Sequence, residues 1–394
     1  MGKKTPAKAV STDANDINAR VEAALAKVKL LNIVQLAEEN PMDVETFSTG
    51  FPQLDQLLHP TLRGFPCGRD VEVFSPYGQA GKSSLCLQII AAAQRSGLLP
   101  ALIEVERTNT DSYMVNLGVV LDRKNPNIAA LRILRAQEIG EYLTVEDVLT
   151  ALQQMANIFD VIVVDSVAAL DKKANLEKDS TENTQLGGIA KNLSEFCRKN
   201  LVRKATIFWI NQMREDSKAY SPSGSTVMKP TGGRALGFYS SVRLELKVIE
   251  KVKDGETTIG MKVEIKALKN KMGFPDRKTT LTYLYGMGFS AEWDYTNLGV
   301  KMNVIRKSGA WLEFDVPAVP PGAVMMTTGN GEVFGGGSPA RKFKVCGLVK
   351  FVKALRADQE AFDALKKMVD GEDVAEIEDV DDLGTELDDA AEAA

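Results

Sequence analysis

Short runs of apolar residues recur between about residues 46 and 290, and segments of helical periodicity separate them. The runs that predict strands are VEVF (71–74), ALIEVE (101–106), DVIVVDS (160–166) and ATIFWINQ (205–212), and the segments that predict helices are 84–97, 144–158 and 187–201. Strands that are apolar on both faces and alternate with helices are typical of a parallel sheet covered on both sides. The pattern therefore predicts an α/β fold built on a mainly parallel sheet.

The pattern changes on both sides of this core. Residues 16–31 place apolar side chains at steps of four, four and three, which predicts a helix with one apolar stripe. A helix this short must dock on its own chain or on a neighbouring subunit, and 32–36 predicts a short strand beside it. Residues 242–250 and 258–270 alternate in polarity around a turn, which predicts an antiparallel hairpin added to the sheet.

Beyond residue 290 loop-rich segments precede another helical stretch. We therefore divide the chain into four parts: a basic tail, docking helix and strand at 1–41, a core at 42–290, a small α+β C-terminal domain at 291–369 and an acidic tail at 370–394.

The charge distribution is uneven along the 394 residues. The net charge is −5, but residues 370–394 contain twelve acidic residues and no lysine or arginine, so the rest of the chain is basic. A basic body with an acidic tail fits a nucleic-acid binder whose tail competes with phosphate for one surface. A disordered tail that serves only solubility remains the alternative.

Cysteine and histidine usage excludes several classes of site. The four cysteines stand singly and His59 is the one histidine, so a disulfide framework, a zinc site and a histidine-centred triad are not expected. The sequence contains neither a signal-peptide pattern nor a membrane-length apolar run, so we expect a cytoplasmic protein without a membrane partner.

The segment VFSPYGQAGKSSL (73–85) follows a strand and opens a helix, as a phosphate-binding loop does. The strict pattern requires a glycine where Pro76 stands, and one extra residue before Gly81 accounts for the mismatch. We expect the loop from Pro76 to Ser84 to bind the nucleotide, with Gly78 and Gly81 supplying unusual backbone angles. Lys82 would reach the outer phosphates, and Ser83 would be a ligand of Mg²⁺.

Acidic residues stand at two further strand ends. Asp165 ends VIVVD, where a buried acid needs a cation or hydrogen-bond donors, and holding Mg²⁺ through water suits it. An acid that merely caps the next turn is the structural alternative. Glu104 and Glu106 face the same side of a strand, and Glu106 is better placed to orient a water toward a γ-phosphate. An exposed pair of charges is the alternative, above all for Glu104.

Two amides end the strand ATIFWINQ. Asn211 and Gln212 are both expected to lie beside the γ-phosphate and to report its presence. The segment that follows them, 213–233, is predicted to be a long loop without regular structure, and such loops are usually functional or disordered. A switch that becomes ordered on ligand binding fits this position.

These motifs belong to a longer ordered set. Its strings are MDVETFSTG (42–50), GKSS (81–84), VIVVDSVAAL (161–170), INQMR (210–214), TGGRALGFYSSVRLEL (231–246), KNK (269–271), LYGMG (284–288) and GVKMNVIRKSGAW (299–311). In order and spacing they resemble bacterial RecA recombinases over about 42–312. Hexameric helicases and clock-type ATPases share the core fold that this implies, but not these strings.

The resemblance implies a RecA-type P-loop ATPase core that uses ATP and Mg²⁺, and it assigns roles to matching residues. Lys82, Ser83 and Ser84 would bind phosphates and Mg²⁺ with support from Asp165, and Tyr113, Tyr285 and Gly286 would contact the base and edge of the nucleotide. Glu106 would be the catalytic glutamate and Gln212 the γ-phosphate sensor. Lys269 and Lys271 would reach a neighbour's ATP, with a solvated strand end as the alternative, and Phe238 would couple neighbouring subunits.

The resemblance also implies DNA binding through two loops, here about 177–188 and 213–233. The matching positions that contact the DNA backbone are Lys191, Ser194, Arg198, Arg214, Gly232 and Gly233. Such groups hold phosphates without reading sequence.

Some positions depart from the family pattern. Pro76 breaks the strict loop, Thr110 replaces an acid near the adenine site, and Gly237 replaces a lysine beside the ATP interface. Both DNA loops are longer than the bacterial type, and 313–345 has no match. These differences suggest a divergent or bacteriophage-encoded member.

The reading that results is a DNA-dependent ATPase that forms a helical filament on single-stranded DNA and pairs it with homologous double-stranded DNA for strand exchange in recombination and repair. Single-strand-binding and mediator proteins are possible partners. The alternatives are a hexameric helicase motor on the same core and an ATP-gated DNA-binding assembly protein with little turnover.

Overall fold

The computed structural model describes residues 44–59, 61–76, 78–125, 127–136, 143–170, 188–199, 203–215, 228–231, 233–318, 325–326, 333–334 and 339–371. Apart from Val44 they belong to one compact unit, Glu45–Ala394. The predicted docking helix and strand, the first DNA loop up to 187, Gly232 and the acidic tail beyond 371 lie outside the described residues.

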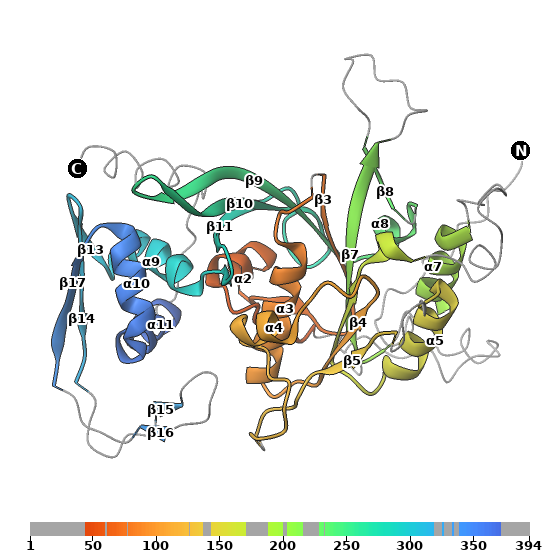
Figure 1. Cartoon of the computed structure of the whole chain (residues 1–394), viewed down its shortest axis with the longest axis horizontal. Helices are drawn as coiled ribbons and strands as arrows, with labels where there is room; N and C mark the ends of the chain where they lie inside the picture. The colour runs from red at the N-terminus through yellow and green to blue at the C-terminus, as the bar shows by residue number, and fades with distance from the viewer. Residues whose placement is uncertain are drawn as a thin grey trace, which may run out of the picture. The chain divides into compact units, whose positions relative to one another are not determined.

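A large mixed sheet forms the centre of the core (Figure 1), and its strands run in the order β12-β11-β10-β9-β3-β7-β6-β4-β5. Neighbours from β9 (Val242–Asp254) through β3 (Asp70–Ser75), β7 (Thr206–Glu215), β6 (Val161–Asp165) and β4 (Pro100–Glu104) to β5 (Arg132–Leu134) are parallel. The strands β10 (Thr257–Asn270), β11 (Lys278–Leu284) and β12 (Gly288–Phe289) continue the sheet in antiparallel fashion, and β8 (Met228–Pro230) pairs with β7. The expected α/β class and the antiparallel hairpin are confirmed.

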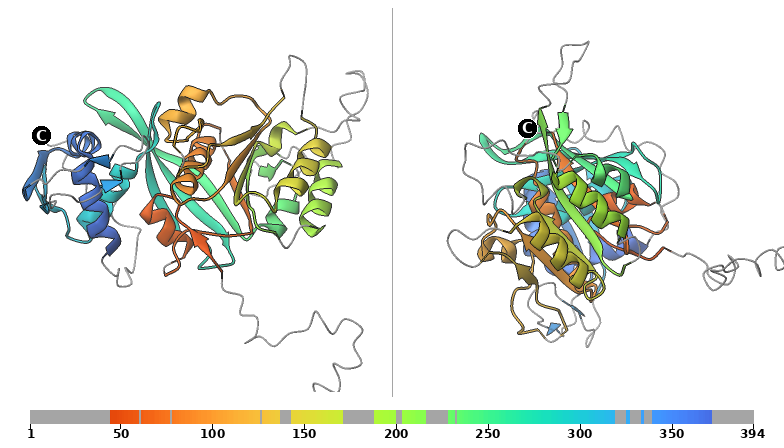
Figure 2. Two further views of the ribbon diagram at one scale, coloured as in Figure 1. Left: turned by 90° about the horizontal axis from the view of Figure 1, so that it is seen from below. Right: turned by 90° about the vertical axis from the view of Figure 1, so that its right-hand side faces the viewer.

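Helices cover both faces of the sheet, as the apolar strands predict. In β6, Val161 and Val163 enter one hydrophobic cluster, and Ile162 and Val164 enter another. The first cluster contains residues of α2 (Pro52–Leu58), α3 (Lys82–Arg95) and α4 (Asp111–Asn116). The second contains residues of α5 (Val145–Met155), α7 (Gly188–Lys199) and α8 (Ala235–Tyr239), and Figure 2 (left) shows the two groups on opposite sides of the strands.

Local sequence signals set several helix starts. Thr144 accepts a hydrogen bond from the Asp147 N–H, and the Asp147 carboxylate accepts one from the Thr144 N–H, so a capping box begins α5. Ser290 begins α9 (Ala291–Lys301) by accepting a hydrogen bond from the Trp293 N–H. The short remaining elements are β1 (Thr46–Phe47), β2 (Phe65–Pro66), a 3₁₀ turn at Val167–Ala169, β15 (Met325–Met326) and β16 (Val333–Phe334).

A further hydrophobic cluster lies among residues 295–369. It combines the antiparallel strands β13 (Arg306–Ser308), β14 (Trp311–Val316) and β17 (Arg341–Cys346) with α9, α10 (Leu348–Ala357) and α11 (Gln359–Gly371). Phe351 is fully buried in it and packs edge-on against Phe343, with ring centroids 5.2 Å apart. None of the helices in the described residues is long and apolar enough to cross a membrane.

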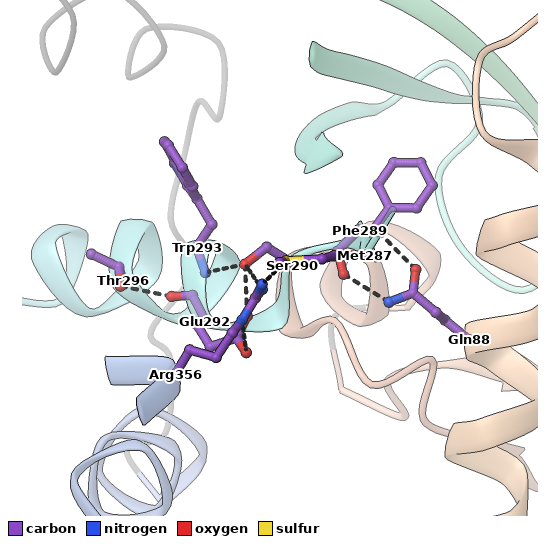
Figure 3. A network of polar contacts seen from close by, with 8 residues as sticks. All are labelled: Gln88, Met287, Phe289, Ser290, Glu292, Trp293, Thr296 and Arg356. Atoms are coloured by element: carbon purple, nitrogen blue, oxygen red, sulfur yellow. Dashed lines mark hydrogen bonds and ion pairs between the residues drawn. The ribbon is translucent and has the colours of Figure 1, made fainter. Parts of the chain in front are cut away.

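Polar contacts join these C-terminal elements to the core (Figure 3). Arg356 of α10 donates from Nε and Nη2 to the two carboxylate oxygens of Glu292, at 2.9 and 2.8 Å. Three residues before Glu292, the N–H of Phe289 donates to Gln88 Oε1 of α3 at 2.8 Å, and its carbonyl accepts from Gln88 Nε2 at 2.7 Å. The end of β12 and the start of α9 are therefore held between the helix that follows the phosphate loop and α10.

A buried carboxyl group joins α9 to α2. Asp294 accepts hydrogen bonds from the backbone N–H and the side chain of Gln53, and burial raises its pKa to about 7 against the lowering effect of these bonds. The folded protein therefore retains a proton on Asp294 that the unfolded chain releases between about pH 4 and 7. Stability from this group is present at low pH and is lost as the pH rises through that window.

We expect Asp294→Asn to remove this dependence. The free energy of unfolding of the variant relative to the wild type should rise from pH 4 to pH 8, by up to about 4 kcal/mol at about 1.36 kcal/mol per pKa unit. Urea unfolding at several pH values measures it. A difference that stays constant over the window would contradict a protonated Asp294 in the fold.

Candidate functional site

The carboxyl ends of the parallel strands surround one cavity of about 350 Å³. The strand register places Ser75 opposite Gln212, and Glu104 opposite Asp165. The lining comprises the loop and helix start at 79–84 together with Glu106, Asp165, Ser166, Ile210, Gln212, Met261, Tyr283 and Tyr285. Lys82, Ser83, Glu106, Asp165 and Gln212 are thus brought together from four separate parts of the chain.

The phosphate loop takes its backbone turns at positions that the sequence predicts only in part. Gly81 has φ +77°, and a Cβ there would approach ring atoms of Phe289 and Tyr283 to 3.1 Å, so both conformation and space favour glycine. The prediction was wrong for Gly78, whose φ is not in the left-handed region. Gln79 takes that conformation instead, with φ 55°. Pro76 stands directly after β3, where its missing N–H interrupts no ladder hydrogen bond.

Charge is concentrated at the floor of the cavity. Burial lowers the pKa of Lys82, and the carboxylates of Asp165 and Glu106 partly offset that effect. Burial raises the pKa of Asp165, a hydrogen bond with the Ser83 side chain lowers it, and the charges of Glu106 and Glu104 raise it again. Carboxylates are therefore crowded here, and a cation would stabilise their charged forms.

Oxygen ligands in this arrangement fit Mg²⁺. The Ser83 hydroxyl and the Asp165 carboxylate lie within hydrogen-bonding distance of each other. Within the described part of the chain no three His, Cys, Asp or Glu side chains cluster to hold a metal. Mg²⁺ is usually held by one or two protein oxygens, phosphate oxygens and waters, so this pair can serve it when a nucleotide supplies phosphate.

Glu106 lies two residues beyond the end of β4, and two polar side chains lie beside its carboxylate. Ser166 donates a short hydrogen bond from Oγ to Glu106 Oε1, and Gln212 Nε2 lies 3.5 Å from the same oxygen. Ser166 was not predicted, although it directly follows Asp165 at the strand end. The three side chains converge where a base and an amide would act on a terminal phosphate.

Glu104 is not an exposed charge, so the alternative interpretation was wrong for this residue. It is fully buried, and its Oε1 accepts hydrogen bonds from the N–H and Nδ2 of Asn109, at 2.9 and 3.0 Å. Arg135 forms an ion pair with it at 3.6 Å. Asn109 also reaches Asp165 Oδ2 at 3.4 Å, so Glu104 helps to position the candidate metal ligand.

A cluster of three hydroxyl groups lies beside the phosphate loop. Tyr113 Oη is 2.7 Å from Ser84 Oγ and 3.0 Å from Tyr283 Oη, and burial raises the pKa of Tyr113 to about 12. Tyr283 was missed, although its spacing of two from Tyr285 predicts that both rings share one face. Tyr285 is 53% exposed at the cavity, and Gly286 turns the chain with φ +76°.

The side chains of Asn211 and Gln212, which are neighbours within β7, face opposite sides of the sheet. Gln212 lines the cavity, but Asn211 is fully buried and donates from Nδ2 to Glu72 Oε1 at 2.8 Å. The expectation that both amides lie beside the γ-phosphate was therefore wrong for Asn211. Successive strand residues alternate between faces, so only one of the pair can reach the cavity.

The candidate interface residues lie on α8 and at the end of β10. Lys269 donates from Nζ to the carbonyls of Gly237 and Phe238, at 2.9 and 2.8 Å. Phe238 is 70% exposed, and Lys271 is exposed one residue past the end of β10.

Four of the six candidate DNA contacts lie on α7 or directly against it in the described residues. Lys191, Ser194 and Arg198 are spaced by three and four residues, which places them on one face of that helix. Gly233 has φ +79°, and a Cβ there would approach the Ala190 side chain to 2.7 Å, so the end of the second loop lies against the start of α7.

The prediction of a structureless loop at 213–233 was wrong at both ends. Residues 213–215 continue β7, and β8 pairs with them through Met213–Pro230, Arg214–Lys229 and Glu215–Met228. The hydrogen bonds from Thr231 to the Gln212 carbonyl, at 3.0 Å for N–H and 2.9 Å for Oγ1, extend this contact. Residues 216–227 lie outside the described residues.

The chain matches known proteins both in sequence and in structure. The model of the RecA N-terminal domain matches residues 17–290, which is more than half of the chain. Among solved structures the chain is similar to one described as the crystal structure of the RadB recombinase, with 21% identity and a TM-score of 0.42 over 62% of this chain and 98% of that one.

Gly81 and Gly97 offer a matched pair for testing the loop. Both take left-handed angles, φ +77° and +78°, but nothing lies within 4 Å of a Cβ at Gly97. We expect Gly81→Ala and Gly97→Ala each to cost about 1–2 kcal/mol of stability through the backbone. Only Gly81→Ala should weaken binding of a fluorescent ATP analogue, by at least about tenfold, or about 1.4 kcal/mol. Equal nucleotide affinity in the two variants would show that the loop does not bind the nucleotide.

Proposed function

The chain belongs to the RecA family, and on that premise we propose that it is an ATP-dependent recombinase that assembles into a helical filament on single-stranded DNA and exchanges strands with homologous duplex. The observation that carries the proposal is the convergence of Lys82, Asp165, Glu106 and Gln212 on one cavity at the strand ends. Phosphoryl transfer depends mainly on positioning and charge stabilisation, and this set provides both.

We expect ATP and Mg²⁺ to bind in this cavity. The N–H groups at the start of α3 and the Lys82 ammonium would hold the phosphates, while Ser83 and Asp165 would hold Mg²⁺, which neutralises developing charge when bound. Glu106, fixed by Ser166, would accept the proton of the attacking water. The aromatic side of the pocket, with Tyr285 exposed on it, would receive the base.

DNA binding and assembly would connect to this cavity through β7. The strand leads from Gln212 directly into the ladder with β8, which closes the second candidate DNA loop. On the α8 side, Phe238 presents a large apolar side chain to solvent, which suits a contact with a second copy of the chain. We therefore infer that ATP bound near Gln212 favours an arrangement of neighbouring subunits that holds the DNA strand.

Two substitutions separate nucleotide binding from hydrolysis. Lys82→Ala removes the cation that faces the phosphates, so binding of ATP and DNA-stimulated phosphate release should both be lost. Glu106→Gln keeps the shape but removes the base, so ATP binding should persist while kcat falls about 10²–10⁴-fold.

Electron microscopy with ATP and single-stranded DNA completes this test. Wild type and Glu106→Gln should form open helical filaments, and Lys82→Ala should not. Closed rings would favour a helicase motor instead, and normal hydrolysis by Lys82→Ala would refute the assigned site.

The salt dependence of DNA binding tests whether the face of α7 with Lys191, Ser194 and Arg198 contacts DNA. The double variant Lys191→Ala/Arg198→Ala should bind single-stranded DNA more weakly, and its log–log salt slope should be shallower by about 1.4, at about 0.7 per phosphate contact. Fluorescence anisotropy over a salt series measures it. The control is Lys124→Ala, which removes a lysine that is 89% exposed and paired with Asp122. An unchanged slope in the double variant would exclude α7 from the DNA interface.

A further inference from the structure

An ion pair with a fully buried carboxylate joins β3 and β9 next to the candidate nucleotide site. Glu72 of β3 is fully buried, and Arg243 of β9 donates from Nε to its Oε2 at 2.6 Å. Its other oxygen, Oε1, accepts from Asn211 Nδ2 of β7 at 2.8 Å. A single carboxylate thus ties together three adjacent parallel strands through their side chains.

On the β7 side this contact reaches the candidate phosphate sensor. The side-chain oxygen of Asn211 accepts a hydrogen bond from the Gln212 N–H at 2.9 Å. Glu72 fixes the amide orientation of Asn211, because the carboxylate requires the NH₂ group to face it. The orientation of Asn211 in turn holds the backbone from which the Gln212 side chain enters the cavity.

On the β9 side the same contact reaches the candidate subunit interface. The guanidinium of Arg243 lies over the Phe74 ring, 5.0 Å from its centroid, and a Cβ on Gly237 of α8 would stand 3.5 Å from Arg243 Cζ. Lys269 bonds the carbonyls of Gly237 and Phe238, and the charges of Arg243 and Glu72 both act on this ammonium group.

We propose that the Glu72–Arg243 ion pair is the positioning element that couples Gln212 at the nucleotide cavity to α8 and Lys269 at the subunit interface. The path consists of Gln212, Asn211, Glu72, Arg243 and α8, and a polar or ionic contact under 3 Å forms each step as far as Arg243. A displacement of Gln212 by a terminal phosphate shifts the side-chain amide of Asn211. Because Glu72 and Arg243 are bonded in sequence to that amide, they shift with it and move α8. This inference rests on the proposed ATP-dependent function.

The fold provides a matched control on the same strand. Asp70 stands two residues before Glu72 and is also buried. It accepts a hydrogen bond from Trp209 Nε1 of β7 at 2.8 Å and forms an ion pair with Arg203 Nη2 at 2.8 Å. The register pairs Asp70 with Ile207, toward the end of the strands that lies away from the cavity. Asp70 therefore matches Glu72 in burial and chemistry but not in its connection to Gln212.

The experiment compares Glu72→Gln with Asp70→Asn in the full-length protein. Each replaces a buried carboxylate by its neutral isostere, so both should lower the melting temperature. Only Glu72→Gln should reduce kcat for ATP, by about 100-fold through misplacement of Gln212, with KM nearly unchanged. Arg243→Lys keeps the charge on a side chain that is 21% exposed, so it should lower kcat less than Glu72→Gln but more than Asp70→Asn, and it serves if Glu72→Gln does not fold.

Hydrogen exchange without nucleotide gives a second, independent readout. Glu72→Gln should speed exchange of the Gln212 amide and of α8 amides such as Phe238 at least about tenfold, whereas Asp70→Asn should not. Equal effects of the two variants on kcat and on exchange would overturn the coupling. A wild-type protein that fails to hydrolyse ATP would instead contradict the proposed function, and the exchange comparison would still decide whether the ion pair links the two regions.

Discussion

The parallel hydrogen-bond ladders between β3, β7, β6 and β4 are the constraint on which the site depends. They bring four strand ends, which are far apart in the sequence, into one row, and each end delivers one part of the chemistry. Because side chains alternate across a sheet, the same register decides that Gln212 faces the cavity and that Asn211 faces the buried Glu72. A slip of one residue would turn the shorter amide of Asn211 toward the cavity and would bury Gln212 on the opposite face.

Acidic side chains within the sheet and in the cavity have different partners. On β3, Asp70 and Glu72 each contact an arginine and a hydrogen-bond donor of β7, so their charges are compensated within the protein. In the cavity, by contrast, Asp165 has its pKa raised by burial and by neighbouring acids, and the nearby cation is Lys82. Acids kept in a buried site despite their cost support the proposal that a nucleotide binds here together with Mg²⁺.

Much of this arrangement could be predicted from the sequence, because apolar runs locate strand ends and strand ends locate chemistry. That reasoning placed Lys82, Asp165, Glu106 and Gln212 at one edge. It failed where the outcome depended on distant partners: the burial of Glu104 requires Asn109 and Arg135, and no local pattern links them. The left-handed turn falls on Gln79 rather than Gly78, although residue preference favours glycine for such angles.

The ladder between β7 and β8 has a consequence for how this protein can diversify. Its three residue pairs hold Glu215 and Met228 opposite each other, so the number of residues between them can change while these two ends stay paired. Lengthening the segment between them costs little, about 0.6 kcal/mol for each doubling, because only closure entropy changes. Selection can therefore vary the length and composition of this segment from one lineage to another without disturbing the cavity that Gln212 lines.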